Sequence, residues 1–296
     1  MTAKRTPPPL WIAAEARGPD WTFWAMSGDS VKEQQQARLE HGTDDPGFEA
    51  TYLQLCTALG GPTDIPLIVS GLGRIAHVPV PTRPEACLPV ALSMDGSAGT
   101  VPAATELLAV PGLSQTSPPA VMRYEAMRIS GFLSLNRSWE GVICLPGATT
   151  HWALISADEV VSFQSFLTTS MVETAFARAG LQADHWRPQT LEDTVADTIS
   201  RPELTAARLA EALADQALNG AEALDTAGKI WGALLGAELA AARPYWLGQN
   251  LALIGAQEHA APYATALKAQ GLSVTVADAE RMSLAGLTRV WRQLAD

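Results

Sequence analysis

The residues best suited to chemistry lie in a short loop near the middle of the chain. In residues 141–155, GVICLPGATTHWALI, Pro146 and Gly147 interrupt an apolar run and the tripeptide Ala-Thr-Thr follows. The apolar runs on both sides predict a buried strand, a tight loop and a return strand. The backbone N–H groups and hydroxyls of such a loop can hold a phosphate group, although a plain β-hairpin explains the same pattern.

The same pattern occurs near the start of the chain. Residues 10–15, LWIAAE, predict a strand, residues 16–20 a turn, and residues 21–26, WTFWAM, the return strand. In both copies a small polar turn and a third short β-like run follow. Two such units about 130 residues apart predict a duplicated fold of two ordinary domains. Two loops facing each other across a cleft would clamp the phosphates of a nucleotide.

Length and composition narrow the class of protein. A chain of 296 residues can hold two domains, and its 47% hydrophobic and 17% charged residues indicate a folded globular protein. The net charge of −11 argues against nucleic acid or an anionic membrane as a partner, because both require clustered Lys and Arg. A small anionic ligand remains compatible with this charge, since a few local donors suffice to bind it.

The cysteines and the apolar segments predict a cytoplasmic protein. Cys56, Cys87 and Cys144 are scattered without a CxxC pair, which suits a reducing compartment. We find no signal peptide and no apolar run long enough to span a membrane. The histidines are dispersed without the spacing of a metal cluster.

The first half of the chain alternates predicted strands and helices. Helical spacing predicts a helix over 46–59 and again over 120–135, and short buried strands are expected at 66–69 and 106–110. The intervening Ser/Thr/Pro segment, Ser114–Pro119, is interpreted as an inter-domain hinge. Residues 34–45 are polar and predict irregular chain.

The second half contains several predicted helices. Helices are expected over 170–179, 202–218 and 226–242, the last capped by Asp225, whereas the polar residues 189–201 predict a connection. Gly232 and Gly236 share one face of the last of these helices, which permits close approach of a neighbouring backbone. Tight helix packing explains this pair at least as well as ligand contact.

The end of the chain predicts a repeated strand-helix unit. Residues 251–254 and 272–276 are expected to be strands, and residues 258–269 and 281–294 helices. Such an order favours parallel pairing of the two strands. The turn Gly255-Ala256-Gln257 leads into a helix N-terminus, which suits an anion or a nucleotide.

Four stretches in this order resemble the 2-dehydro-3-deoxygalactonokinase family of sugar-acid kinases. They are VMRYEAMRISGFL (121–133), LPGATTHW (145–152), GALLGAEL (232–239) and LALIG (251–255). The resemblance implies an α/β protein with the duplicated ribonuclease-H-like fold of the actin-like ATPases, in which two domains surround a central cleft. We expect domains at 10–116 and 117–296, with the last helix able to pack back on the first domain.

Membership of this family would imply transfer of the ATP γ-phosphate, with Mg²⁺, to the 6-hydroxyl of 2-dehydro-3-deoxy-D-galactonate. The substrate would be a small-molecule sugar acid, and a homodimer is a further expectation. Two alternatives stay open. One is a catalytically degenerate homologue that binds a sugar acid, a nucleotide or a protein partner, and the other is a different phosphotransfer or hydrolase reaction on the same scaffold.

The family motifs are altered in the first loop, which is the turn at residues 16–20 together with Glu15 before it, and in the middle of the chain. Glu15 keeps the carboxylate of the first loop, but Arg17 replaces a glycine and Pro19 removes an N–H donor. Ala120 stands at the position where the family has an aspartate that is expected to act as the base. Loss of such a group typically lowers the rate by about 10²–10⁴-fold. Glu125 is the nearest substitute.

The second loop is altered as well, since Ala148 stands where the family has Thr, Thr149 where it has His and His151 where it has Lys. The resemblance nevertheless assigns three groups of site residues. The expected catalytic residues are Glu15 and Glu125; those expected to bind phosphate or nucleotide are Arg17, Gly18, Gly147, Thr149, Thr150, Gly255, Ala256 and Gln257; those expected to bind substrate are Gly71, Gly73, Arg74 and Arg123. No residue is assigned as a metal ligand.

Overall fold

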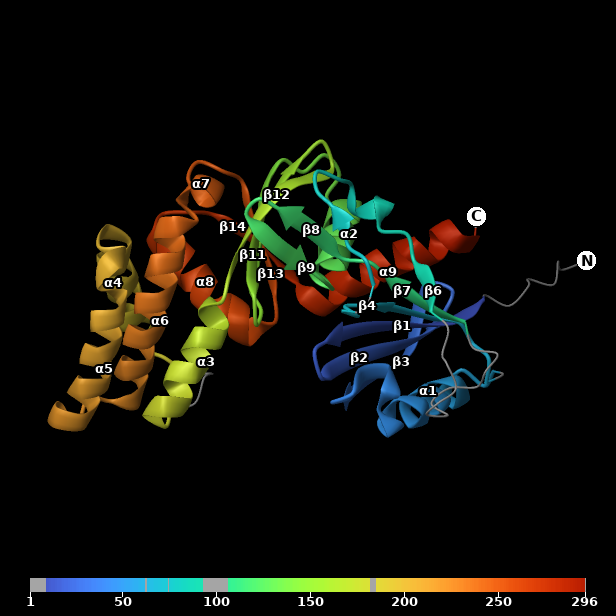
Figure 1. Ribbon diagram of the computed structural model, residues 1–296, viewed down its shortest axis with the longest axis horizontal. Helices are drawn as coiled ribbons and strands as arrows, with labels where there is room; N and C mark the ends of the chain where they lie inside the picture. Colours follow the sequence, from blue (N-terminus) through green and yellow to red (C-terminus); the bar gives the residue numbers. More distant parts are fainter. Residues whose placement is uncertain (1–8, 62, 74, 93–105, 182–184, 296) are drawn as a thin grey trace, which may run out of the picture. The chain divides into compact units, whose positions relative to one another are not determined.

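The computed structural model describes residues 9–61, 63–73, 75–92, 106–181 and 185–295. The chain separates into two compact units, and Figure 1 shows that each is built around its own β-sheet. The first unit comprises Met1–Arg137 and Glu280–Asp296, and the second comprises Ser138–Ala279. The last helix therefore belongs to the first unit.

The main sheet of the first unit has the strand order β3-β2-β1-β4-β7-β6, beside a smaller sheet of order β5-β8-β9. The strands are β1 (Leu10–Arg17), β2 (Asp20–Ser27), β3 (Ser30–Arg38), β4 (Leu67–Ser70), β5 (Val78–Pro79), β6 (Val90–Leu92), β7 (Leu107–Val110), β8 (Leu113–Thr116) and β9 (Pro119–Met122). β1 pairs antiparallel with β2 and parallel with β4. The first predicted strand-turn-strand unit is thus confirmed.

The sheet of the second unit has the order β12-β11-β10-β13-β14. Its strands are β10 (Gly141–Leu145), β11 (Thr150–Ser156), β12 (Glu159–Phe166), β13 (Leu251–Gly255) and β14 (Val274–Asp278). As in the first unit, three antiparallel strands are followed by parallel ones, and β13 and β14 pair parallel as predicted. The shared order confirms the predicted duplication, and the cleft expected between the domains stays a prediction.

The helices complete the two units. They are α1 (Pro46–Ala58), α2 (Glu125–Leu135) and α9 (Ala279–Ala295) in the first unit, and α3 (Thr168–Ala179), α4 (Pro188–Ser200), α5 (Thr205–Asn219), α6 (Ala223–Ala241), α7 (Arg243–Trp246) and α8 (Gln257–Ala269) in the second. Short 3₁₀ helices lie at Gly42–Asp44, Pro84–Ala86 and Pro202–Leu204. Among the described residues we find no helix long and apolar enough to cross a membrane.

Three local predictions in the first unit are wrong. Residues 34–38, expected to be irregular, continue β3, because an edge strand with polar, exposed side chains lacks apolar alternation. The Ser/Thr/Pro segment 114–119 is no linker, since β8 and β9 pair antiparallel there, and α2 begins at Glu125 instead of Ala120. The predicted domain boundary at 116/117 falls between these paired strands, whereas the compact units divide after Arg137.

Two predictions in the second unit are also wrong. Residues 189–201 form most of α4 and no connection, and only Leu191, Val195 and Thr198 on one face of that helix are buried. Asp225 does not cap α6, because Glu222 occupies the N-cap position. Asp225 instead accepts hydrogen bonds from Arg187 and Thr190.

The glycines of α6 serve helix packing. A Cβ on Gly232 would lie 2.5 Å from the Cβ of Thr194, and one on Gly236 would lie 2.6 Å from that of Thr198. α4 therefore packs closely along this face of α6, as Figure 1 also shows. The packing interpretation of the glycine pair is confirmed.

The helix α9 packs against other elements of the first unit near both of its ends. Trp291 stacks on Trp11 of β1, with 5.2 Å between ring centroids. Nearer its start, α9 crosses α2 so closely that a Cβ on Gly131 would lie 1.9 Å from the carbonyl oxygen of Met282. This crossing brings the side chains of α2 and α9 to the end of β1 where the candidate site lies.

Candidate functional site

The first candidate region lies where the parallel strands of the first unit end. Glu15 of β1 is in register with Ser70 of β4, and Ser70 with Val110 of β7. Ligands of open α/β sheets bind outside the carboxyl ends of such strands. The Ser70 hydroxyl is buried and has no hydrogen-bond partner among the described residues, so this strand end retains a free polar group.

Glu15 is held in a buried ion pair that sequence reasoning did not foresee. Arg128 of α2 donates to it from Nη2 at 2.6 Å and from Nε at 3.1 Å, and the Ser283 hydroxyl of α9 donates to the same carboxylate. Burial would lower the pKa of Arg128, but the Glu15 carboxylate raises it, and the guanidinium stays charged. The pair therefore ties β1 to α2 and α9.

Both oxygens of Glu15 are occupied by these donors. A carboxylate that holds Mg²⁺ directly or through water needs a free oxygen lone pair directed at the ligand, and a guanidinium already neutralises this charge. In this arrangement Glu15 does not fit a metal-holding role. Its expected catalytic role stays a prediction, and it requires the pair with Arg128 to open.

The first predicted phosphate loop is a two-residue hairpin turn. Arg17 pairs with Asp20 across the turn, and Gly18 between them has a φ of 67°. The Arg17 guanidinium lies 3.4 Å from the Thr22 hydroxyl and 3.6 Å from Glu15. Since Pro19 offers no N–H group, this turn presents few donors to a phosphate.

The predicted substrate residues come together only in part. Gly73 lies beside the Arg123 side chain, because a Cβ on Gly73 would be 3.6 Å from its Nε. Gly71, with a φ of 97°, instead packs against the backbone of β1, and a Cβ there would be 2.0 Å from the Ala16 carbonyl oxygen. Arg74 lies outside the described residues.

Glu125 and His77 stand close to Arg123. The Glu125 carboxylate accepts a hydrogen bond of 2.8 Å from the Arg123 backbone N–H at the start of α2. Burial and the Arg123 charge lower the pKa of His77, so its imidazole is neutral at pH 7. We did not predict a role for His77, since its only signal in the sequence is an isolated histidine.

The second candidate region is the loop between β10 and β11 in the second unit. The predicted turn after β13 touches this loop, because a Cβ on Gly255 would lie 3.2 Å from the carbonyl oxygen of Pro146. The Ser170 hydroxyl of α3 donates to the Ala148 carbonyl at 2.8 Å. Ala256 then caps α8, whose first residue is Gln257. The structure thus brings the predicted residues of this unit to one place, namely Gly147, Thr149, Thr150, Gly255, Ala256 and Gln257.

A buried hydrogen-bond network connects the end of this loop, at Thr150, to Glu238 of α6. The Thr150 hydroxyl lies 2.8 Å from the Tyr263 hydroxyl, which donates to Oε2 of Glu238 at 2.8 Å, and Trp152 donates from its indole to Oε1 at 2.7 Å. The Thr168 hydroxyl is a further donor to Glu238. Burial raises the pKa of Glu238 to about 6.

Glu238 is the main residue that sequence reasoning missed. Its motif, GALLGAEL, was recognised, but only its glycines were interpreted. A glutamate near the end of an apolar helix was the available signal, because a charged residue on a buried face requires partners. The neighbouring His151 is also buried and pairs with Ser165 at 2.8 Å, so it does not extend towards solvent as a lysine would.

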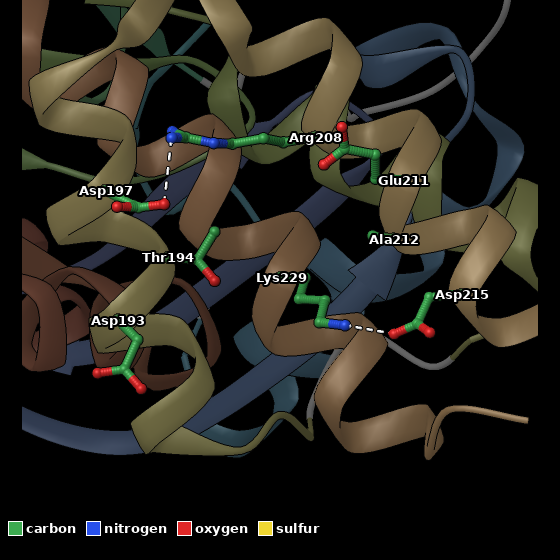
Figure 2. Close-up of a pocket in the computed structure, with 8 residues that line it drawn as sticks. All are labelled: Asp193, Thr194, Asp197, Arg208, Glu211, Ala212, Asp215 and Lys229. Atoms are coloured by element: carbon green, nitrogen blue, oxygen red, sulfur yellow. Dashed lines mark hydrogen bonds and ion pairs between the residues drawn. The ribbon is translucent and has the colours of Figure 1, made fainter. Parts of the chain in front are cut away.

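A charged hollow of about 470 Å³ lies between α4, α5 and α6, away from the loop. Figure 2 shows Lys229 paired with Asp215, and Arg208 paired with Asp197. Both basic side chains that line the hollow are therefore already paired with acidic side chains of the same hollow. Among the described residues we find no group of three or more His, Cys, Asp or Glu placed to hold a metal ion.

The repeated strand order, with loops after β1 and β10, defines the fold that the actin-like ATPases share. The activator of the 2-hydroxyisocaproyl-CoA dehydratase of Clostridium difficile, with bound ADPNP, has a similar fold, with a TM-score of 0.58, 8% identity and coverage of 97% of this chain and 96% of the other. A candidate 2-dehydro-3-deoxygalactonokinase of Sinorhizobium meliloti has a TM-score of 0.84, 24% identity and coverage of 96% and 99%. These likenesses establish the fold.

The family follows from sequence. The model of the 2-keto-3-deoxy-galactonokinase family matches residues 20–290, and the chain belongs to this family. A probable 2-dehydro-3-deoxygalactonokinase, DgoK1, of Rhizobium meliloti (strain 1021) is 28% identical over 297 residues, which cover 96% of this chain and 93% of the relative. The resemblance noted from the four motifs is confirmed.

Proposed function

We propose that this protein is a sugar-acid kinase that transfers the γ-phosphoryl group of ATP to the 6-hydroxyl of 2-dehydro-3-deoxy-D-galactonate. The observation that carries the proposal is the match of the family model to residues 20–290, which include every strand of the main sheets except β1. The substrates are MgATP and the free sugar acid, and the reaction takes place in the cytoplasm, where ATP is supplied.

The second loop is the better candidate for the nucleotide phosphates. Gly147 and Thr149 lie in it, and the turn at Gly255 and the start of α8 adjoin it. Backbone N–H groups at a helix N-terminus and in a loop suit phosphate oxygens. Phosphoryl transfer depends mostly on positioning and on stabilisation of charge, so a loop of this kind supplies much of what the reaction requires.

The sugar acid is assigned to the first unit. Arg123 is exposed beside Gly73, where its guanidinium can pair with the substrate carboxylate. His77 adds a neutral imidazole that can hydrogen-bond to a hydroxyl or carbonyl group of the sugar. This arrangement distinguishes a sugar acid from a neutral sugar through one charge-assisted contact.

Proton removal is the weak step of the proposed reaction. Ala120 occupies β9, where the family resemblance expects an aspartate. The loose transition state of phosphoryl transfer needs little help from a base early in the reaction, so we expect turnover that is slow and not absent. An aspartate at this position should raise the rate by up to about 100-fold, the lower end of what a positioned base contributes.

The test is a coupled assay of ADP release by the purified protein with MgATP, with and without 2-dehydro-3-deoxygalactonate. We expect release that depends on the sugar acid, faster in Ala120→Asp and unchanged in the neutral control Ala120→Asn. ADP release that ignores the sugar acid in all three proteins would refute the proposal.

A further inference from the structure

Glu238 differs from the other acidic residues of the second unit in having a buried carboxylate without a cation. Its hydrogen-bond donors come from three elements, namely Trp152 of β11, Tyr263 of α8 and Thr168 of α3. The Cys144 thiol of β10 is close enough to interact with it electrostatically, and Thr150 of β11 is bonded to Tyr263. Burial raises the pKa of both Cys144 and Tyr263, so both keep their protons at neutral pH. Among the described residues no lysine or arginine acts on the carboxylate.

The directions of the hydrogen bonds follow from what each group can donate. An ionised carboxylate only accepts, so Tyr263 donates its single proton to Glu238. The Tyr263 oxygen must then accept from Thr150. While Glu238 is ionised, the Thr150 hydroxyl therefore uses its proton for Tyr263 and cannot donate it to a ligand of the loop.

A proton on Glu238 reverses this chain. Trp152 occupies Oε1 and can only donate, so the proton settles on Oε2 and is donated to Tyr263. Tyr263 then donates to Thr150, so the Thr150 hydroxyl no longer donates to Tyr263 and becomes available to donate to another acceptor at the end of the loop. The same protonation also removes the negative charge of the Glu238 carboxylate.

We propose that Glu238 is a positioning residue that acts through Tyr263 on Thr150, and that its gain of a proton makes the loop 146–150 a better site for an anion. The proposal deepens the proposed function, because the anion is the phosphate group of the nucleotide. Release of a donor and loss of a charge both favour phosphate, so the two effects add.

The test compares the wild-type protein with Glu238→Gln in calorimetric titrations with ADP at pH 5.5 and pH 8. The amide is neutral at every pH, so we expect the variant to bind ADP about tenfold more tightly at pH 8, the effect of one charge near the phosphate. At pH 5.5 the two proteins should converge. Because ADP itself titrates in both proteins, the difference between them reports Glu238 alone.

Glu222→Gln is the matched control. It makes the same chemical change at the N-cap of the same helix, where the side chain is exposed and pairs with Arg187. We expect its ADP affinity to stay within twofold of the wild type at both pH values. Equal ADP affinities for the wild type and Glu238→Gln at pH 8 would overturn the proposal.

A second measurement needs no nucleotide and separates this inference from the proposed function. In NMR spectra of the free protein, the Trp152 indole and the Gly147 and Thr149 amides should titrate with one midpoint, and all three titrations should vanish in Glu238→Gln. If ADP fails to bind at any pH, the proposed function fails, and these spectra decide the inference alone. Amides of the loop that stay fixed while the indole titrates would refute it.

Discussion

Each unit contains a buried glutamate that accepts hydrogen bonds, but the partners of the two carboxylates differ. Glu15 in the first unit pairs with Arg128, whereas every described donor to Glu238 in the second is a neutral group. A cation at contact distance favours the ionised form, and burial without a cation favours the protonated form. The same strand order therefore supports one fixed charge and one that can change near neutral pH.

This contrast separates the roles of the two loops. In the first unit the carboxylate and its partners fasten β1 to α2 and α9, and the turn at Gly18 and Pro19 is tight and poor in donors. In the second unit the loop is longer and adjoins a helix N-terminus. We infer that the first region serves mainly structure and substrate, and the second the nucleotide.

The largest effect is expected from breaking the ion pair of the first unit. Arg128→Met leaves the buried Glu15 charge with only the longer contact to Arg17 at 3.6 Å, which should lower the free energy of unfolding by about 3–5 kcal/mol. Urea denaturation measures this loss. The control Arg292→Met breaks an exposed pair with Asp29 and should cost less than about 1 kcal/mol. Similar losses in both variants would contradict the account of Glu15.

Tyr263→Phe should have the next largest effect. The variant removes a hydrogen bond to the carboxylate and leaves Thr150 without its partner, for an expected loss of about 1.5–3 kcal/mol in the free energy of unfolding at pH 8. Tyr52→Phe is the matched control, because that hydroxyl donates to the neutral Ile65 carbonyl at 2.7 Å, and it should cost about 1 kcal/mol. A smaller loss in Tyr263→Phe than in Tyr52→Phe would show that the network contributes little.

The pH dependence of stability should distinguish the second unit from the first. Glu238 has a folded-state pKa of about 6 against the ordinary 4.5. The folded state thus binds the proton more tightly, and the contribution of this group is present below pH 4.5 and is lost as the pH rises through 6. The wild type should lose about 2 kcal/mol relative to Glu238→Gln between pH 4 and pH 8. Parallel stability curves would contradict this result.

The smallest effect is expected at the first turn. The Arg17 side chain is partly exposed, and its Nε lies 3.6 Å from Glu15, a weak contact beside that of Arg128. Arg17→Ala should lower the free energy of unfolding by less than about 1 kcal/mol and leave ADP affinity unchanged. A tenfold loss of ADP affinity in this variant would return the first turn to the phosphate site.

The sequence predicted the elements whose cores are apolar. The duplicated strand-loop-strand units, α1 and the parallel pair β13–β14 all carry buried residues at the expected spacing. The polar elements were missed, because β3 and α4 expose most of their side chains and offer little apolar periodicity. The β8–β9 hairpin was hidden by Ser, Thr and Pro, which are equally common in linkers.

The site could be predicted only where its residues are close in sequence. The loop 146–150 and the turn at Gly255 were recognisable from local composition. The pair of Glu15 with Arg128 and Ser283 joins residues more than a hundred positions apart, and the contact of Glu238 with Tyr263 depends on how α6 and α8 pack. Neither partner follows from spacing along the chain.

The measurement that tests the central claim most directly is phosphorus NMR of the protein incubated with MgATP and 2-dehydro-3-deoxygalactonate. The account predicts a new phosphate ester whose signal couples to two protons, as a phosphate on the 6-hydroxyl requires, together with ADP in equal amount. ATP that remains intact, or ADP that accumulates with inorganic phosphate only, would contradict it.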